Sequence, residues 1–216
     1  GAERWHRNVG EQLAESGHDV TFLTLRQWDT DPNVPGVRVI AAGPQMALYA
    51  RGGRRRLLPP VVFGLGVLRH LLRHGRGYDV VHTASFPYFS LLAAGAARGR
   101  RRYRIMVDWH EVWTREYWRE YLGPLAGRVG WLVQRACLRV PQRAFCFSRL
   151  HERRLRELGL RGELTLLEGQ YAERRTTESP ENALPVAVFA GRFIPEKRVP
   201  ALVPALARAM EQIPDL

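Results

Sequence analysis

The sequence is poor in cysteine and lysine and contains no long apolar run. Its two cysteines, Cys137 and Cys146, lie in apolar surroundings, which favours buried thiols over a disulfide framework or a metal site. The longest apolar candidate, residues 60–72, is interrupted by Arg69 and falls short of the ~18 residues that a membrane span needs. No signal-peptide pattern opens the sequence. We therefore expect a cytoplasmic protein that contacts the inner face of the membrane at most peripherally.

Positive charge is in excess. Lysine and arginine together number 33 against 21 acidic residues, which gives a net charge of +12 at pH 7, and every long cation except Lys197 is arginine. Three explanations are open: binding to nucleic acid, binding to an anionic membrane surface, or an arginine-rich genome without functional meaning. The remaining composition, 45% hydrophobic and 25% charged, is that of a globular domain.

Apolar strand patterns and amphipathic helix patterns alternate along the chain, which favours an α/β fold with doubly wound parallel sheets. Ser148 is expected to cap a helix, and Gly123-Pro124 to break one. The pattern predicts strands at 18–24, 37–41, 79–82, 103–108, 144–147, 164–167 and 185–190, and helices at 2–16, 60–74, 88–97, 112–139, 148–159 and 199–210.

The domain organisation follows from this pattern. Residues 1–171 are predicted to form one domain that opens on a helix, and the polar stretch 172–184 is typical of a linker. Residues 185–216 supply one strand and one helix, which cannot bury a core alone. We therefore expect an internal fragment that lacks the first strand of one domain and most of a second.

Near the end of the chain, a short apolar stretch at 188–190 leads into Gly191, Arg192 and, after a turn, Lys197. A glycine lets a ligand approach the backbone, and the two cations offer a planar fork of donors and a compact point charge. A helix start nearby also favours anions. The segment suggests a diphosphate clamp, with two solvated surface cations as the alternative.

This segment resembles the G-R-(L/F)-x-x-x-K motif of retaining family 4 glycosyltransferases, whose GT-B fold consists of two facing Rossmann-like domains. The resemblance implies that Gly191, Arg192 and Lys197 bind the diphosphate of a nucleotide-sugar donor. It also implies transfer of the sugar to a glycan, lipid-linked or small-molecule acceptor with retention of configuration. No metal and no other cofactor is expected, and no His, Cys and Asp cluster with ligand spacing is visible in the sequence.

His110 follows a predicted buried strand, and ligands of open α/β sheets bind at the carboxyl ends of strands. Its pairing with Glu111 resembles the H-(D/E) pair of the family, which implies a contact with the donor sugar or the charge that develops on it. The alternative is a histidine packed beneath Trp109 and Trp113. Asp108 and Glu111 also suggest the paired carboxylates of a glycoside hydrolase, which we disfavour because no second cluster supports it.

Further candidates lie on the acceptor side. The opening Gly1-Ala2-Glu3-Arg4 resembles the family's G-G-x-E-R at a helix N-terminus, where Gly1 would let the backbone approach phosphate or acceptor; a plain capped helix is the alternative. Thr83 and Ser85 end a strand on the same edge of the sheet, and Ser85 is expected to cap the next helix. Glu111 and Trp113 complete the acceptor-side candidates.

Aromatic residues recur from Trp113 through Tyr117 and Tyr121, and apolar residues continue to Val133. Such a stripe is either core or an interfacial helix beside a lipid-linked acceptor. The arginine-rich loop 51–56 opens on the carboxyl edge and could meet anionic headgroups or simply be solvated. The cluster 98–102 joins a helix to a strand, so it lies at the opposite edge and lacks interleaved aromatics; no nucleic-acid partner is expected.

The sequence also departs from the family pattern. Residues 167–171 retain only Gly169 of the usual P-N-G-(V/I)-(D/N), Arg198 stands where glycine is common, and Pro204 is expected to kink a helix. The family's acidic donor motif would lie beyond Leu216. Two alternatives to a glycosyltransferase stay open: another GT-B enzyme such as a nucleotide-sugar epimerase, or a non-catalytic basic protein that binds nucleic acid or membrane on the same scaffold.

Overall fold

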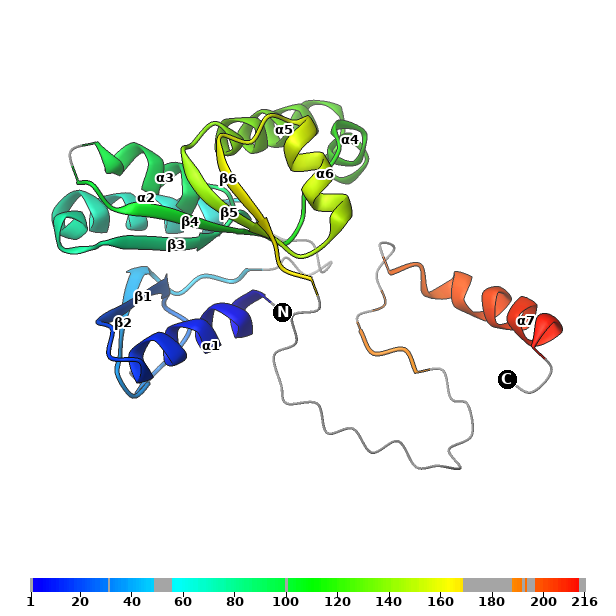
Figure 1. Cartoon of the computed structure of the whole chain (residues 1–216), viewed down its shortest axis with the longest axis horizontal. Coiled ribbons are helices and arrows are strands. Elements are labelled where there is room, and N and C mark those ends of the chain that lie inside the picture. The colour runs from blue at the N-terminus through cyan, green and yellow to red at the C-terminus, as the bar shows by residue number, and fades with distance from the viewer. Residues whose placement is uncertain are drawn as a thin grey trace. The chain divides into compact units, whose positions relative to one another are not determined.

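The computed structural model describes residues 2–30, 32–48, 56–99, 101–168, 188–191, 193 and 197–213 (Figure 1). The chain divides into two compact units, residues 1–172 and 173–216, and each is described by itself. The predicted linker at 172–184 lies outside the described residues.

The first unit contains two parallel sheets. Strands β1 (Val20–Leu25) and β2 (Val37–Gly43) form a pair, while β3 (Val80–Ala84), β4 (Arg104–Trp109), β5 (Gln142–Cys146) and β6 (Gly162–Leu166) form a four-stranded sheet in that order. All of these pairings are parallel. Parallel neighbours need a crossover, and helices supply the crossovers between consecutive strands of the larger sheet. The predicted α/β class with parallel sheets is confirmed.

Six α-helices accompany these strands in the described part of the first unit: α1 (Ala2–Glu15), α2 (Leu58–His74), α3 (Phe89–Arg98), α4 (Arg115–Leu122), α5 (Pro124–Leu138) and α6 (Arg149–Glu157), with a short 3-10 helix η1 (Gly75–Gly77) after α2. Helix α2 contacts both β1 and β2 and packs against α3, which contacts β3 and β4, so the pair α2–α3 links the two sheets. The contact is close at Gly66, where a side chain would collide with the carbonyl oxygen of Ala42 on β2. None of the described helices is long and apolar enough to cross a bilayer.

Local sequence signals determined several helix ends. Gly123 has a φ of 83°, a conformation that suits glycine, and Pro124 opens α5 where its missing N–H is not needed, so the predicted break is confirmed. Ser148 caps α6 by accepting a hydrogen bond from the His151 N–H, as predicted. The predicted cap by Ser85 is wrong. Helix α3 begins after Tyr88, which places Ser85 too far from the first-turn amides.

The core lies around the four-stranded sheet. Ile105, Val107 and Trp109 of β4 are all buried, as expected of a central strand covered on both faces. The Trp109 indole is fixed by a 2.8 Å hydrogen bond to Gln142 Oε1. Cys137 and Cys146 are free and fully buried, which confirms the prediction of buried thiols. Burial raises the pKa of both thiols.

Arginines of the predicted basic cluster 98–102 contact backbone carbonyls. Arg101 donates to the oxygens of Ala97 (2.8 Å) and Leu72 (2.9 Å), which lie in the last turns of α3 and α2. Arg98 donates to the oxygen of Pro141 at 3.3 Å. Carbonyls at helix ends lack intrahelical partners, so Arg101 stabilises the ends of α3 and α2. The other predicted cluster, 51–56, lies outside the described residues except for Arg56.

In the second unit, the described residues form the 3-10 helix η3 (Val199–Ala201) and helix α7 (Leu202–Gln212). Part of the predicted strand 185–190 lies outside the described residues, and 188–190 form no strand. The predicted kink at Pro204 is wrong. The proline occupies the first turn of α7, where a backbone N–H has no intrahelical acceptor to lose. Arg198 has a φ of 47°, which explains why glycine suits this position.

Candidate functional site

The candidate site lies at the carboxyl ends of β3, β4 and β5, where helix α1 meets the larger sheet. This is the edge at which open parallel sheets bind ligands. Five rings and one carboxylate from five segments meet here: Trp5 and His6 of α1, His82 of β3, Asp108 of β4, His110 after β4, and Phe147 after β5.

Asp108 is the centre of this group, and its side chain is almost fully buried, with the residue 1% exposed. Its Oδ2 atom accepts a 2.8 Å hydrogen bond from the Trp5 indole N–H. The Nε2 atoms of His82 and His6 lie 2.9 and 3.3 Å from the same oxygen. Three nitrogen atoms from two different elements therefore surround one carboxylate oxygen.

These contacts decide the charge of Asp108. Burial alone would raise the pKa of the carboxyl, because it penalises the charged form. The contacts with His82, Trp5 and His6 outweigh burial, so the pKa lies below its ordinary value. Asp108 is therefore a carboxylate at neutral pH, inside a chain of strong net positive charge.

His110 is held by ring contacts. It stacks on Phe147 with ring centroids 4.7 Å apart and planes 6° from parallel, and the His6 ring meets it edge-on at 6.1 Å. Of the two rings that the alternative expectation placed over His110, the Trp109 indole is turned to Gln142 in the core. The predicted position of His110 at the carboxyl edge of the sheet holds.

The structure also brings together a set of atoms with metal-binding chemistry. One ligand atom from each of His6, Asp108 and His110 lies within 4.8 Å of the others. No such cluster is visible from sequence spacing, because the three residues come from α1, β4 and the loop after β4.

The acceptor-side candidates divide into two groups. Ser85 adjoins the cluster, because its backbone N–H donates to the Asp108 carbonyl at 2.9 Å. Thr83 instead contacts the hydroxyl of Ser90 on α3 at 3.0 Å. Glu111 is exposed and accepts a 2.9 Å hydrogen bond from the Trp113 indole. This hydrogen-bond partner is not one of those that contact the Asp108 carboxylate.

Sequence reasoning missed Gln134, a fully buried amide on α5. Its Oε1 lies within hydrogen-bonding distance of three donors, Tyr88 OH at 3.1 Å and the Trp113 N–H and Trp118 indole at 3.2 Å. Its Nε2 donates to the Trp113 carbonyl at 2.9 Å. Gln134 thus holds both backbone groups of Trp113 and ties the loop after His110 to the core. A lone amide in an apolar helix is the signal that pointed to it.

The remaining predicted residues are only partly described. Gly1 and Arg192 lie outside the described residues, and the side chain of Glu3 is not described. Arg4 is exposed in the first turn of α1. Gly191 and Lys197 are exposed in the second unit. The diphosphate clamp therefore stays a prediction.

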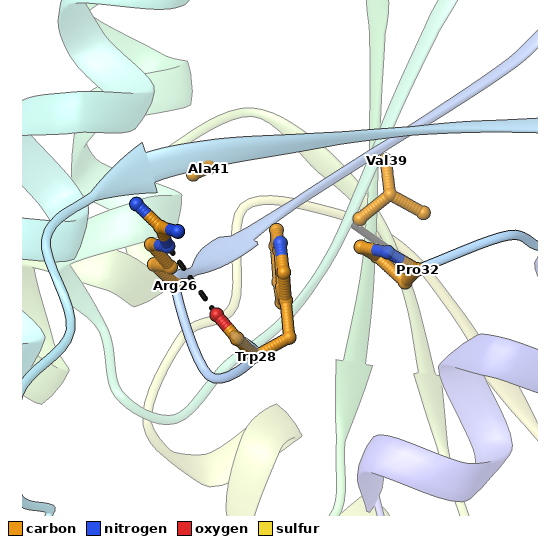
Figure 2. Close-up of a pocket in the computed structure, with 5 residues that line it drawn as sticks. All are labelled: Arg26, Trp28, Pro32, Val39 and Ala41. Carbon is orange, nitrogen blue, oxygen red and sulfur yellow. Dashed lines mark hydrogen bonds between the residues drawn. The ribbon is translucent and has the colours of Figure 1, made fainter. Parts of the chain in front are cut away.

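Two cavities share no residue with this cluster. The first, of about 450 Å³, lies at the β1–β2 sheet, and Figure 2 shows the Trp28 indole between Arg26 and Pro32 in it. Arg26 Nε donates to the Trp28 carbonyl at 3.3 Å. The second, of about 530 Å³, lies between β2 and α2 and is lined by arginines and histidines of α2. Neither cavity contains a residue predicted for the site.

Comparisons with known proteins agree with this architecture. The family model of the glycosyl transferase 4-like domain matches residues 1–168. The structure is similar to that of sucrose-phosphate synthase from Thermosynechococcus elongatus, with a TM-score of 0.59 and 18% sequence identity. That match covers 78% of this chain and 42% of the other, so this chain spans less than half of that structure's length. No curated protein matches the sequence significantly. The predicted Rossmann-like GT-B class is confirmed.

Proposed function

Because the chain belongs to the glycosyl transferase 4-like family, we propose that the protein transfers a sugar from a nucleotide-diphosphate donor to an acceptor, with retention of configuration. One observation carries the proposal within that family: His110 stands at the carboxyl edge of the larger sheet, with its ring orientation set by Phe147 and His6. A site for sugar chemistry needs a hydrogen-bond donor that is held in place before the sugar arrives.

His110 is the proposed catalytic residue of this unit. An imidazole donates a hydrogen bond to a sugar hydroxyl, or to charge that develops near the anomeric carbon, with no net charge of its own. Stacking on Phe147 removes rotational freedom from the ring, so less entropy is lost when the sugar binds. Asp108 supports the arrangement as a buried anion beside His6 and His82.

The donor diphosphate is assigned to Gly191, Arg192 and Lys197 by resemblance to the family motif. Lys197 is exposed, and no salt bridge is found for it among the described residues, so its ammonium is available to an anionic ligand. Two cations at the leaving diphosphate would stabilise negative charge that grows during transfer, an effect of several kcal/mol in a water-poor site. Transfer itself is proposed to need no metal and no cofactor.

The acceptor is proposed to enter beside the amino-terminal segment and the ends of β3 and β4. Ser85, Glu111 and Trp113 are the described candidates nearest to His110 in the sequence or to Asp108 in the structure. Thr83 is a weaker candidate because its hydroxyl contacts α3. Gly1, Glu3 and Arg4 are assigned by resemblance, at the start of α1.

The exposed face of α5 supports a lipid-linked acceptor, because it has the composition of a membrane-contacting helix. Leu125, Val129 and Leu132 of α5 follow one another at helical spacing and are 83%, 60% and 57% exposed, with exposed Arg128 among them. The predicted stripe thus divides, since Trp118 is core whereas these three are not. Apolar and basic residues on one exposed helix are typical of a membrane-surface helix. We propose contact with an anionic membrane, at the inner face if the protein is cytoplasmic.

Vesicle sedimentation tests this contact. Wild-type protein should bind vesicles that contain anionic lipid, and Leu125→Glu with Val129→Glu should lower the bound fraction severalfold. Glu120→Gln on neighbouring α4 is the control that leaves the apolar surface intact. Equal binding of the wild type and the Leu125→Glu, Val129→Glu variant would show that α5 does not contact the membrane.

The sugar-transfer proposal is tested at Lys197 in the full-length protein, with a panel of nucleotide sugars and release of nucleoside diphosphate as the readout. We expect Lys197→Ala to lower transfer at least tenfold, about 1.4 kcal/mol in the barrier. Arg208→Ala is the matched control, because it removes an exposed cation that lies on α7 and outside the proposed diphosphate clamp. Unchanged turnover and donor affinity in Lys197→Ala would remove Lys197 from the mechanism.

The same panel separates the alternatives. An epimerase would release and epimerise the sugar without acceptor. A non-catalytic binder would show salt-dependent binding to DNA or anionic vesicles and no protection from thermal unfolding by any donor.

A further inference from the structure

The ligand set of His6, Asp108 and His110 is not needed as a set for sugar transfer. We propose that these three side chains bind a divalent transition-metal ion of the zinc class, a function beyond the proposed transferase activity. One ligand atom of each residue already lies within 4.8 Å of the other two. The three residues belong to α1, β4 and the following loop, so tertiary folding has brought them together.

One of the three interatomic distances already matches a coordination shell. Zinc bonds to nitrogen and oxygen measure about 2.0–2.1 Å, so neighbouring ligand atoms of a tetrahedral site lie about 3.3 Å apart. His6 Nε2 and Asp108 Oδ2 are 3.3 Å apart. The third ligand atom, from His110, lies within 4.8 Å of the other two and has to move closer to complete a tetrahedral shell.

The direction of the nitrogen atoms matters as much as their separation. His6 and His110 are only partly buried, yet their Nε2 atoms are shielded from solvent. Histidines that serve only as solvated surface residues would turn these nitrogens to water. Here both nitrogens are turned away from solvent, and that of His6 lies 3.3 Å from the Asp108 carboxylate.

The donor types suit the ion. Imidazole nitrogen with one carboxylate is a ligand combination of zinc sites, and three protein ligands leave a fourth position for water or a hydroxyl. Around such sites, a ligating carboxylate is itself hydrogen-bonded. Asp108 meets this condition through the Trp5 indole N–H at 2.8 Å, and His82 Nε2 adds a contact at 2.9 Å.

A second histidine pair provides the comparison that makes the proposal testable. His70 and His74 of α2 have ring centroids 4.9 Å apart, at a spacing of one helical turn that also suits metal binding. Their surroundings are unfavourable for a cation. His70 Nε2 is 2.7 Å from the Tyr78 hydroxyl. Arg69 and Arg73 line the same cavity, and none of the described residues that line it is acidic.

The test uses tag-free, full-length protein that has been treated with EDTA and then titrated with Co²⁺, followed by visible absorption. We expect one Co²⁺ per chain with the bands of a low-coordinate site, displaced by Zn²⁺. His6→Ala should weaken binding at least tenfold, about 1.4 kcal/mol. His74→Ala, the matched control, should leave the affinity unchanged. If His6→Ala does not fold by circular dichroism, His6→Gln and Asp108→Asn replace it.

The absence of a stoichiometric Co²⁺ site would overturn the proposal, and so would binding that survives His6→Ala and Asp108→Asn or that is lost in His74→Ala. Because His110 is shared, a bound ion should also inhibit sugar transfer, a consequence that rests on the proposed function. The Co²⁺ spectrum needs no substrate. A protein that binds Co²⁺ as expected but transfers no sugar would therefore refute the transferase and leave the metal site standing.

Discussion

The two histidine groups of the first unit differ in what surrounds them. His6, His82 and His110 come from three segments and gather around the buried carboxylate of Asp108. His70 and His74 come from one helix and lie among arginines beside a surface cavity. The residue type is the same in both places, so the neighbours decide what the imidazoles can do.

Electrostatics separates the groups. Burial, His74 and Arg38 lower the pKa of His70, because a positive charge there would be poorly solvated and would meet other cations. Asp108 keeps its negative charge because nitrogen atoms surround it. Cations are attracted to the first group and repelled from the second. The comparison teaches that histidine content alone predicts neither a metal site nor a catalytic one.

Substitution of Gln134, which holds the loop after His110, should have the largest effect on the free energy of unfolding. Gln134→Leu removes the partner of the Tyr88 hydroxyl, the Trp118 indole and both backbone groups of Trp113. We expect the free energy of unfolding to fall by about 3 kcal/mol in urea denaturation, since buried unpaired polar groups cost about 1–3 kcal/mol each. Gln12→Leu, at an exposed helical glutamine, is the control. A loss below about 0.5 kcal/mol would show that this network does not hold the His110 loop.

Asp108 gives the next largest effect. Asp108→Ala leaves the Trp5 indole without its acceptor and empties a buried position. We expect a loss of about 2 kcal/mol in unfolding free energy, whereas His74→Ala on the surface of α2 should change it by less than about 0.5 kcal/mol. Both are measured by urea denaturation at neutral pH. Equal effects would mean that the carboxylate does not organise the first group.

The smallest effect is a pH dependence. The pKa of His70 in the folded protein lies below its ordinary value of 6.5, so the unfolded chain binds more protons just below that value. Stability should therefore fall as the pH drops below about 6.5, and His70→Gln should reduce this slope. His151, whose pKa is lowered mainly by burial and also by Arg154, contributes to the same window and keeps part of the slope. Thermal unfolding from pH 7 to 5 measures it, and an unchanged slope in His70→Gln would contradict the assignment.

Much of the fold was predictable because local rules govern it. The alternation of strand and helix patterns, the break at Gly123-Pro124, the cap at Ser148 and the two buried thiols all follow from short stretches of sequence. The errors were also local. Ser85 and Pro204 were placed in the wrong relation to a helix start, since boundaries shift by a few residues when tertiary packing selects them.

The candidate site was predictable only in part. His110 could be placed at the edge of the sheet because parallel strands all end there. Its partners could not, because Phe147, His6 and Asp108 are brought to it by separate elements. Gln134 acts through hydrogen bonds to residues up to 46 positions away.

The sequence by itself determined the α/β class, the family and the position of His110, because periodicity, turn chemistry and motif order are encoded in neighbouring residues. Only the tertiary structure decided which of the seven histidines share a carboxylate and which face arginines. The physical reason is that charge and ligand geometry act through space over a few ångströms, whereas the groups concerned lie up to about a hundred residues apart along the chain.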